Sequence, residues 1–204
     1  MLRLSAKIIG AGFRTARRHA ILRALVDEIG EQCEIGVVRN NIVSYVDSVR
    51  VPAPAGLQFD PGGRAPIHCT STGKIFMSRL ALGARKALVH SMSLIAYTDT
   101  TITDPEVLLS ELEDTRQRGW TKTNQEFVKG VVGCAVPIVL ADDTLIACLG
   151  ISVPIARVEF DELDRFIPPM TAAAARLAET VADTEENEDG ENPAPGAGDL
   201  SSAA

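Results

Sequence analysis

Apolar residues recur at helical spacing over the first thirty residues of the chain. Ile21, Leu25 and Ile29 stand at i, i+4 and i+8, which predicts a helix over about residues 15–29 with one apolar face. Gly30 follows at the position where a glycine commonly ends a helix. This helix is therefore expected to pack its apolar face against the rest of the domain.

Two pairs of apolar segments are typical of β-hairpins. The predicted strands are residues 33–38, 42–49, 131–140 and 144–153. Asn40-Asn41 separates the first two strands and Asp142-Asp143 the last two, and such pairs favour tight turns. The second pair of strands is apolar at nearly every position, so both of its faces are expected to be buried in the centre of a sheet.

Capping residues and apolar periodicity predict the remaining helices. They cover residues 71–80, 84–91, 104–118, 160–166 and 170–181. Asp104 precedes Pro105 in a typical helix start, and Gly119 ends the same helix. The last helix carries an apolar stripe formed by Met170, Ala174, Leu177 and Val181. Residues 50–65, rich in proline and glycine, are predicted to form an irregular loop with at most one short strand.

This order of elements predicts an α+β domain with a largely antiparallel sheet. Strands and helices do not alternate as they do in a doubly wound fold, and the G-x-G-x-x-G pattern of dinucleotide-binding domains is absent from the sequence. A nicotinamide- or flavin-dependent enzyme of that class is therefore not expected.

Composition places the chain among soluble globular domains of the cytoplasm. Its 204 residues are 46% hydrophobic and 23% charged, without a signal-peptide pattern or an apolar run long enough to cross a bilayer. The net charge of −7 arises mainly in residues 184–204, which are acidic, lack aromatic residues and are expected to be disordered. The remaining body is almost neutral, and the basic residues of positions 1–26 are interpreted as a solvated helix face.

The cysteines and histidines give no sign of a metal site or of thiol catalysis. The four cysteines contain no C-x-x-C pair and the three histidines are scattered, so we expect no metal and no cofactor. Cys69 follows His68, but neighbours on an extended segment point to opposite sides. A Cys-dependent enzyme is therefore the least favoured class of function.

The segment from Pro66 to Lys74 predicts a loop that turns abruptly into a helix. Ser71 is a good N-cap, and hydroxyl groups cluster beside the expected free N–H groups of the helix start. Such a start attracts a small carboxylate or phosphate, although a capped helix without a ligand explains the same residues. The pair Gly73-Lys74 does not form a nucleotide-binding P-loop, because the first glycine and the following Ser or Thr of that motif are missing.

Two segments together resemble a known family. The first is PIHCTSTGK at residues 66–74; the second begins with RGW at 118–120, continues to Glu126 and ends with GVVGCAVPI at 130–138. Their order and spacing resemble the effector-binding domain of IclR-family bacterial transcription regulators. The resemblance covers residues 13–182 and implies a GAF-like or profilin-like fold, in which helices flank a curved antiparallel sheet.

The same resemblance implies a pocket on the concave side of the sheet for a small organic acid. Its expected effector-binding residues lie at one helix start, on one loop and on two strands: Ser71, Thr72, Thr123, Val131, Gly133, Gly150 and Ser152. Glycines on a shared strand face leave room for a ligand, but they also permit close packing of a helix. Because family members often carry more polar residues at positions 123, 133 and 150, we expect a ligand with some hydrophobic body, such as an aromatic or branched acid.

The resemblance also implies an organisation for the chain. Residues 1–12, a helical lead-in that we expect to be broken by Gly10 and Gly12, resemble the end of an interdomain linker. Residues 13–183 form the effector-binding domain, and 184–204 the tail. Family regulators read DNA through an N-terminal winged helix-turn-helix domain that does not precede this region in the chain, so we expect no specific DNA binding by the chain alone.

The implied mechanism is allosteric: the effector changes the arrangement of domains in a homodimer or homotetramer, and with it the spacing of the DNA-reading domains. No membrane partner is expected. The alternative is a stand-alone GAF-like sensor or interaction module that acts through a protein partner.

Overall fold

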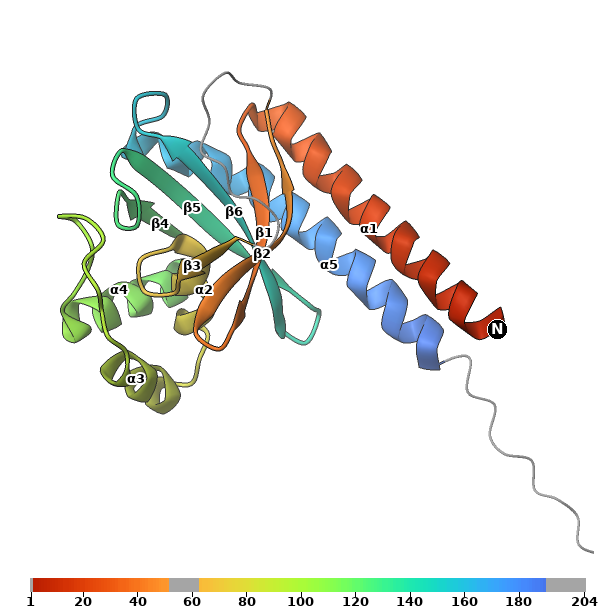
Figure 1. The fold of residues 1–204 in the computed structure, drawn as a ribbon, viewed down its shortest axis with the longest axis horizontal. Helices are drawn as coiled ribbons and strands as arrows, with labels where there is room; N and C mark the ends of the chain where they lie inside the picture. The colour runs from red at the N-terminus through yellow and green to blue at the C-terminus, as the bar shows by residue number, and fades with distance from the viewer. Residues whose placement is uncertain (1, 52–62, 190–204) are drawn as a thin grey trace, which may run out of the picture.

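A six-stranded antiparallel sheet forms the centre of the computed structural model, in the order β3-β2-β1-β6-β5-β4. The structure describes the backbone of residues 2–51 and 63–189 and the side chains of residues 15–51 and 63–181. Helices α1 and α5 cover one face of the curved sheet, and α2, α3 and α4 lie on the other side (Figure 1). The predicted α+β class with a helix-flanked antiparallel sheet is confirmed.

The helices are α1 (Leu2–Ile29), α2 (Ser71–Ser78), α3 (Leu82–Ser91), α4 (Pro105–Arg118), the 3₁₀-helix η1 (Phe160–Phe166) and α5 (Ile167–Asp189). The strands are β1 (Cys33–Arg39), β2 (Ile42–Val49), β3 (Arg64–Pro66), β4 (Thr121–Asn124), β5 (Val131–Val139) and β6 (Leu145–Pro154). None of the helices in the described part of the chain is long and apolar enough to cross a membrane.

Local sequence signals locate the turns and helix ends well. Asn40 and Asn41 both adopt positive φ angles, 51° and 60°, as a tight hairpin turn requires. Asp104 accepts hydrogen bonds from the first N–H groups of α4, and Gly119 ends that helix at a φ of 79°. The predicted hairpin of β5 and β6 is also confirmed, and each of its strands has a neighbour on both sides.

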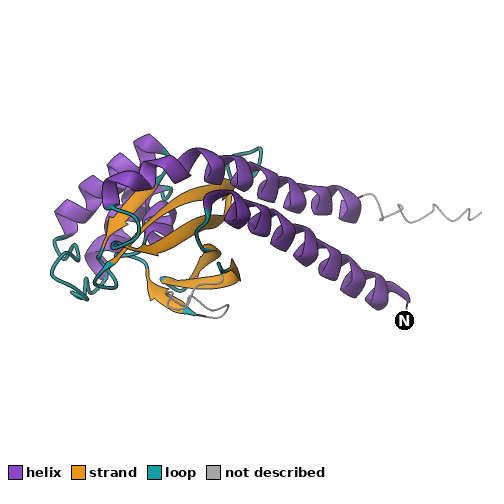
Figure 2. Cartoon of the chain, turned by 90° about the horizontal axis from the view of Figure 1, so that it is seen from above, coloured by secondary structure: helices purple, strands orange, loops and turns teal. Residues whose placement is uncertain are grey.

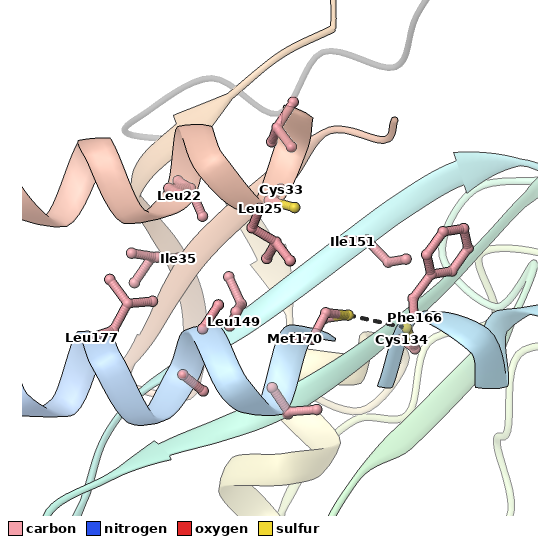
Figure 3. Packing of buried hydrophobic residues seen from close by; sticks show 14 of the residues in the cluster. Leu22, Leu25, Cys33, Ile35, Cys134, Leu149, Ile151, Phe166, Met170 and Leu177 are labelled. Atoms are coloured by element: carbon pink, nitrogen blue, oxygen red, sulfur yellow. Dashed lines mark hydrogen bonds between the residues drawn. The ribbon is translucent and has the colours of Figure 1, made fainter. Parts of the chain in front are cut away.

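The largest hydrophobic cluster lies between the sheet and the pair α1 and α5 (Figure 3). Leu22 and Leu25 of α1 and Leu177 of α5 are almost completely buried against strand residues such as Leu149 and Ile151. Burial of one such side chain stabilises the fold by about 1.5–3 kcal/mol. This side of the sheet is therefore a packed core without a candidate site.

The two long helices differ from their predicted extents. Helix α1 continues through Gly10 and Gly12, so the predicted break is wrong; a helical glycine costs only about 1 kcal/mol. Helix α5 includes residues 184–189, which were expected in a disordered tail, while the rest of that tail, 190–204, lies outside the described residues. Val181, part of the predicted apolar stripe, is 37% exposed. The C-terminal part of α5 extends beyond the sheet beside α1 (Figure 2).

One basic residue of α1 contacts the sheet instead of lying on a fully solvated face. Arg18 Nε donates a hydrogen bond to Asp47 Oδ2 of β2 at 3.0 Å, and Nδ1 of His19 lies 3.1 Å from Oδ1 of the same carboxylate. The interpretation of Arg18 as merely solvated is therefore wrong: it fixes α1 to a strand.

The opposite face of the sheet is lined by small residues. Strand register brings onto this face Gly36, Gly133, Ala135, Cys148, Gly150 and Ser152. A Cβ atom on Gly36 would lie only 2.9 Å from Cγ2 of Thr72. The missing side chains thus allow the first turn of α2 to approach the middle of the sheet, and this approach positions the candidate site.

Candidate functional site

A small cavity lies where the first turn of α2, the small-residue face of the sheet and the loop between β4 and β5 meet. Its volume is about 30 Å³, enough for no more than a few water molecules. Six of the seven expected site residues line it: Ser71, Thr72, Thr123, Val131, Gly133 and Ser152. The structure therefore brings together residues that are far apart in sequence.

Gly150 is the expected site residue that does not line the cavity. A Cβ atom at this position would lie 3.4 Å from Oε1 of Glu34 and 3.5 Å from Oγ1 of Thr72. Gly133 does line the cavity, but its Cβ would lie 2.6 Å from the carbonyl oxygen of Ile151. Gly133 therefore serves close packing and also lines the cavity, whereas a Cβ at Gly150 would make ordinary van der Waals contacts.

The N-cap of α2 is Thr70 and not Ser71, which corrects the prediction. Thr70 has extended backbone, and its Oγ1 accepts a hydrogen bond from the N–H of Gly73 at 3.3 Å and donates to Pro66 O at 2.7 Å. Ser71 is then the first helical residue. The N–H groups of Ser71 and Thr72 have no intrahelical acceptor and lie at the positive end of the helix dipole.

A buried ion pair connects the two segments that carry the family resemblance. Lys74 Nζ donates to Oε1 of Glu126 at 2.6 Å, and their side chains are only 1% and 7% exposed. Burial raises the pKa of Glu126, although the nearby Lys74 charge opposes this shift. Lys74 is committed to this pair, so it is not a free cation for a ligand.

Glu34 of β1 is the least expected residue of the cavity. It is 2% exposed, and Ser152 Oγ donates a hydrogen bond to its Oε1 at 3.0 Å. Burial raises the pKa of Glu34 to about 7, and the Ser152 hydrogen bond only partly offsets this effect. The carboxyl group therefore changes its charge near neutral pH.

Replacement of Glu34 by Gln is expected to remove a pH-dependent loss of stability. Below about pH 4.5 the carboxyl is protonated in both the folded and the unfolded chain. As the pH rises to about 7, the unfolded chain releases this proton first, so the free energy of unfolding falls by about 3 kcal/mol in total and then levels off. Denaturant unfolding of both proteins from pH 4 to pH 8 measures the difference. If the free energy of unfolding of both proteins changed with pH in the same way, this explanation of Glu34 would be wrong.

The thiol and imidazole beside the cavity do not form a catalytic pair. Cys69 lines the cavity, and its pKa is raised to about 12, mainly by burial and further by the charge of Glu126. His68 points to a separate groove, where Nε2 lies 3.0 Å from Ile95 O. In the described ranges, no three or more His, Cys, Asp or Glu side chains cluster as metal ligands.

Sequence reasoning missed part of the cavity wall. The cavity is also lined by Glu34, Tyr45, Phe127 and Val128, and by Cys69, Thr70 and Glu126, which were noted in the sequence but not included among the expected site residues. The lining is therefore more polar than the expected apolar wall. The available signal was Glu34 itself, since a carboxylate at a buried position of an apolar strand calls for an explanation.

Comparisons with known proteins agree with the resemblance. The family model described as "Bacterial transcriptional regulator IclR C-terminal" matches residues 15–179. The "Probable transcriptional regulator SauR" of Cupriavidus necator is 36% identical over 180 residues, which cover 88% of this chain and 71% of that protein. The transcriptional repressor IclR of Escherichia coli is 29% identical over 84% of this chain and 65% of its own length. The Pca regulon regulatory protein of Pseudomonas putida matches over 54% of its length at 30% identity.

Solved structures show the same fold. The inducer-binding domain of a double mutant of PobR from Acinetobacter, in complex with 3-hydroxybenzoic acid, matches with a TM-score of 0.74 and 27% identity over 78% of this chain and 94% of that one. The C-terminal domain of the E. coli regulator KdgR matches with a TM-score of 0.71 and 23% identity over 82% and 97% of the two chains.

Proposed function

The chain belongs to the IclR family of bacterial transcriptional regulators, a family of regulators and not of enzymes, and on that premise we propose that it binds a small organic acid in the cavity beside α2. In this proposal the domain also forms homodimers or homotetramers, and DNA is read by a separate winged helix-turn-helix domain of the regulator. Binding of the acid changes the arrangement of the effector domains and so the spacing of the DNA-reading domains.

The observation that carries the proposal is the position of the α2 N-terminus. The N–H groups of Ser71 and Thr72 lack intrahelical acceptors, and both residues line the cavity. A carboxylate placed there accepts two backbone hydrogen bonds and is attracted by the helix dipole. Thr123 and Ser152 also line the cavity, and their hydroxyl groups supply further polar contacts.

The solved relative with an acid supports this type of ligand. The PobR inducer-binding domain is described as a complex with 3-hydroxybenzoic acid, and it shares 27% identity and the fold with this chain. An aromatic acid is larger than the cavity of about 30 Å³. We therefore propose that binding displaces side chains of the cavity wall.

Phe127 is the part of the wall that we propose to move. It lines both the inner cavity and an outer groove beside His68 and Tyr97. Its ring packs edge-on against Tyr97 with the centroids 5.1 Å apart. A rotation of the Phe127 side chain would join the two spaces and give an acid a route from the surface to α2.

The proposal predicts that Ser71→Pro weakens acid binding without unfolding the domain. Proline is favoured at the first helical position, and Thr70 already has the extended backbone that a residue before proline needs. The substitution removes one N–H donor to the carboxylate, so the affinity should fall about tenfold or more. Ser71→Ala, which removes only the hydroxyl, is the matched control and should bind more tightly than Ser71→Pro.

The measurement is thermal stabilisation and calorimetric titration of this chain with a panel of aliphatic and aromatic carboxylates. A bound acid raises the melting temperature by mass action. If acids bind but Ser71→Pro binds them as tightly as the wild-type chain, the assigned position of the carboxylate is wrong. If no acid binds, the result favours the alternative function, a stand-alone interaction module that acts through a protein partner.

A further inference from the structure

Two buried carboxylates in the cavity each have an oxygen without a hydrogen-bond partner. Oε2 of Glu34 and Oε2 of Glu126 are both fully enclosed and unpartnered, while the Oε1 atoms are bound by Ser152 and Lys74. The two residues are 2% and 6% exposed. Buried polar atoms are rarely left unpaired, so the wall holds two unused acceptors.

The charges around the cavity do not suit a simple carboxylate. Among the described residues, those that line it include these two glutamates and no Lys, Arg or His. Lys74 is held by Glu126 at 2.6 Å. A ligand that offers only acceptor oxygens can bind at the α2 start, but it brings nothing to the free oxygen of Glu34 and repels its ionised form.

Glu34 and the α2 start lie close enough for one small molecule to contact both. The position that a Cβ on Gly150 would occupy is 3.4 Å from Glu34 Oε1 and 3.5 Å from Thr72 Oγ1. Ser152 Oγ donates to Oε1 of Glu34, while Oε2 of the same carboxyl group has no hydrogen-bond partner. Glu34 and the α2 start are therefore close neighbours, and both line the same cavity.

We propose that the effector is a hydroxyl-bearing organic acid, whose carboxylate accepts from the N–H groups of Ser71 and Thr72 and whose hydroxyl donates to Glu34 Oε2. This inference rests on the proposed function and specifies its ligand class. It makes Glu34 the residue that distinguishes hydroxy acids from their unsubstituted counterparts. A hydroxyl group both donates and accepts, so it pairs with the ionised and the protonated form of this carboxyl.

The test compares matched acids that differ at one substituent. Isothermal titration of this chain with 3-hydroxybenzoate, 3-fluorobenzoate and benzoate, and with lactate and propionate, measures the contribution of the hydroxyl group. At least one hydroxy acid is expected to bind about tenfold or more tightly than its counterparts. Equal affinity of hydroxylated and unsubstituted acids would overturn the inference while leaving acid binding intact.

Two substitutions assign the preference to Glu34. Glu34→Leu removes the acceptor and should reduce the hydroxyl preference to about twofold or less, with unsubstituted acids still bound. Glu34→Gln keeps an acceptor oxygen of the same size and should retain part of the preference. A preference that persists in Glu34→Leu would overturn the role of this residue. Binding of none of the acids would overturn the proposed function, and the inference with it.

Discussion

The variant Lys74→Met is expected to lose about 3–5 kcal/mol of its free energy of unfolding. The substitution leaves the carboxylate of Glu126 in a site where the side chain is 7% exposed, and it removes the charged partner that lies 2.6 Å away. Desolvation of an unpaired charge is far more costly than loss of a surface contact. The large expected loss of stability thus comes from the unpaired, buried carboxylate of Glu126, and not from the strength of the ion pair itself.

Denaturant unfolding of single and double variants tests this explanation. Lys74→Met combined with Glu126→Leu removes both charges and should recover most of the lost stability. The control Arg23→Met removes a partner from an ion pair whose side chains are 56% and 70% exposed, and it should behave like the wild-type chain. A double variant no more stable than Lys74→Met would show that the loss has another origin.

The variant Gly73→Ala is expected to lose about 3 kcal/mol or more, because α2 cannot keep its place with a methyl group at this position. A Cβ atom there would lie 2.1 Å from the carbonyl oxygen of Ile67 and 2.4 Å from its Cα. These are backbone atoms of the preceding loop, so no side-chain rotation relieves the overlap. The helix start must shift, and binding of any acid at Ser71 and Thr72 should weaken as well.

Gly83→Ala is the matched control for this substitution. Gly83 also lies in a helix, α3, but nothing lies within 4 Å of its Cβ position. Since alanine is the better helix former, this variant should gain about 0.5–1 kcal/mol. Thermal unfolding of the two variants gives opposite signs if close packing explains Gly73. A destabilised Gly83→Ala, or an unaffected Gly73→Ala, would contradict the explanation.

The sequence predicted those parts of the fold that depend on nearby residues. Asn40-Asn41, Asp104 and Gly119 mark a turn, a helix start and a helix end because their own backbone preferences decide these features. The choice between Thr70 and Ser71 as N-cap could not be made, since both carry a suitable hydroxyl and only the tertiary position of the loop distinguishes them.

The cavity could be predicted only where the family resemblance or strand alternation indicated it. Alternation placed Val131 with Gly133 on one face of β5, and Gly150 with Ser152 on one face of β6. In the register of these strands Gly133 and Ser152 are directly opposite each other. Glu34 was missed because its position depends on the pairing of β1 with β6, which joins residues 34 and 150 across the whole domain. Local sequence does not specify such a pairing.

The structure also divides the motif at residues 66–74 into two roles. Gly73 and Lys74 do not line the cavity: the glycine permits the approach of Ile67, and the lysine is bound to Glu126. The motif residues that line the cavity are Cys69, Thr70, Ser71 and Thr72. One part of the motif therefore fixes the position of α2, and another part lines the cavity.

Strand β1 has a consequence for how the regulator transmits a signal. Glu34 faces the cavity, while its neighbours Cys33 and Ile35 belong to the core cluster that packs α1 against the sheet. Because one backbone carries both sets of side chains, we expect a ligand that binds Glu34 also to displace the surface on which Leu22 and Leu25 rest (Figure 3). Faster or slower amide exchange in α1 on addition of an acid would reveal this coupling, and unchanged exchange would exclude it. The sheet would then couple its two faces directly, since a shift of β1 caused by the effector on one face would move the long helix α1 packed on the other.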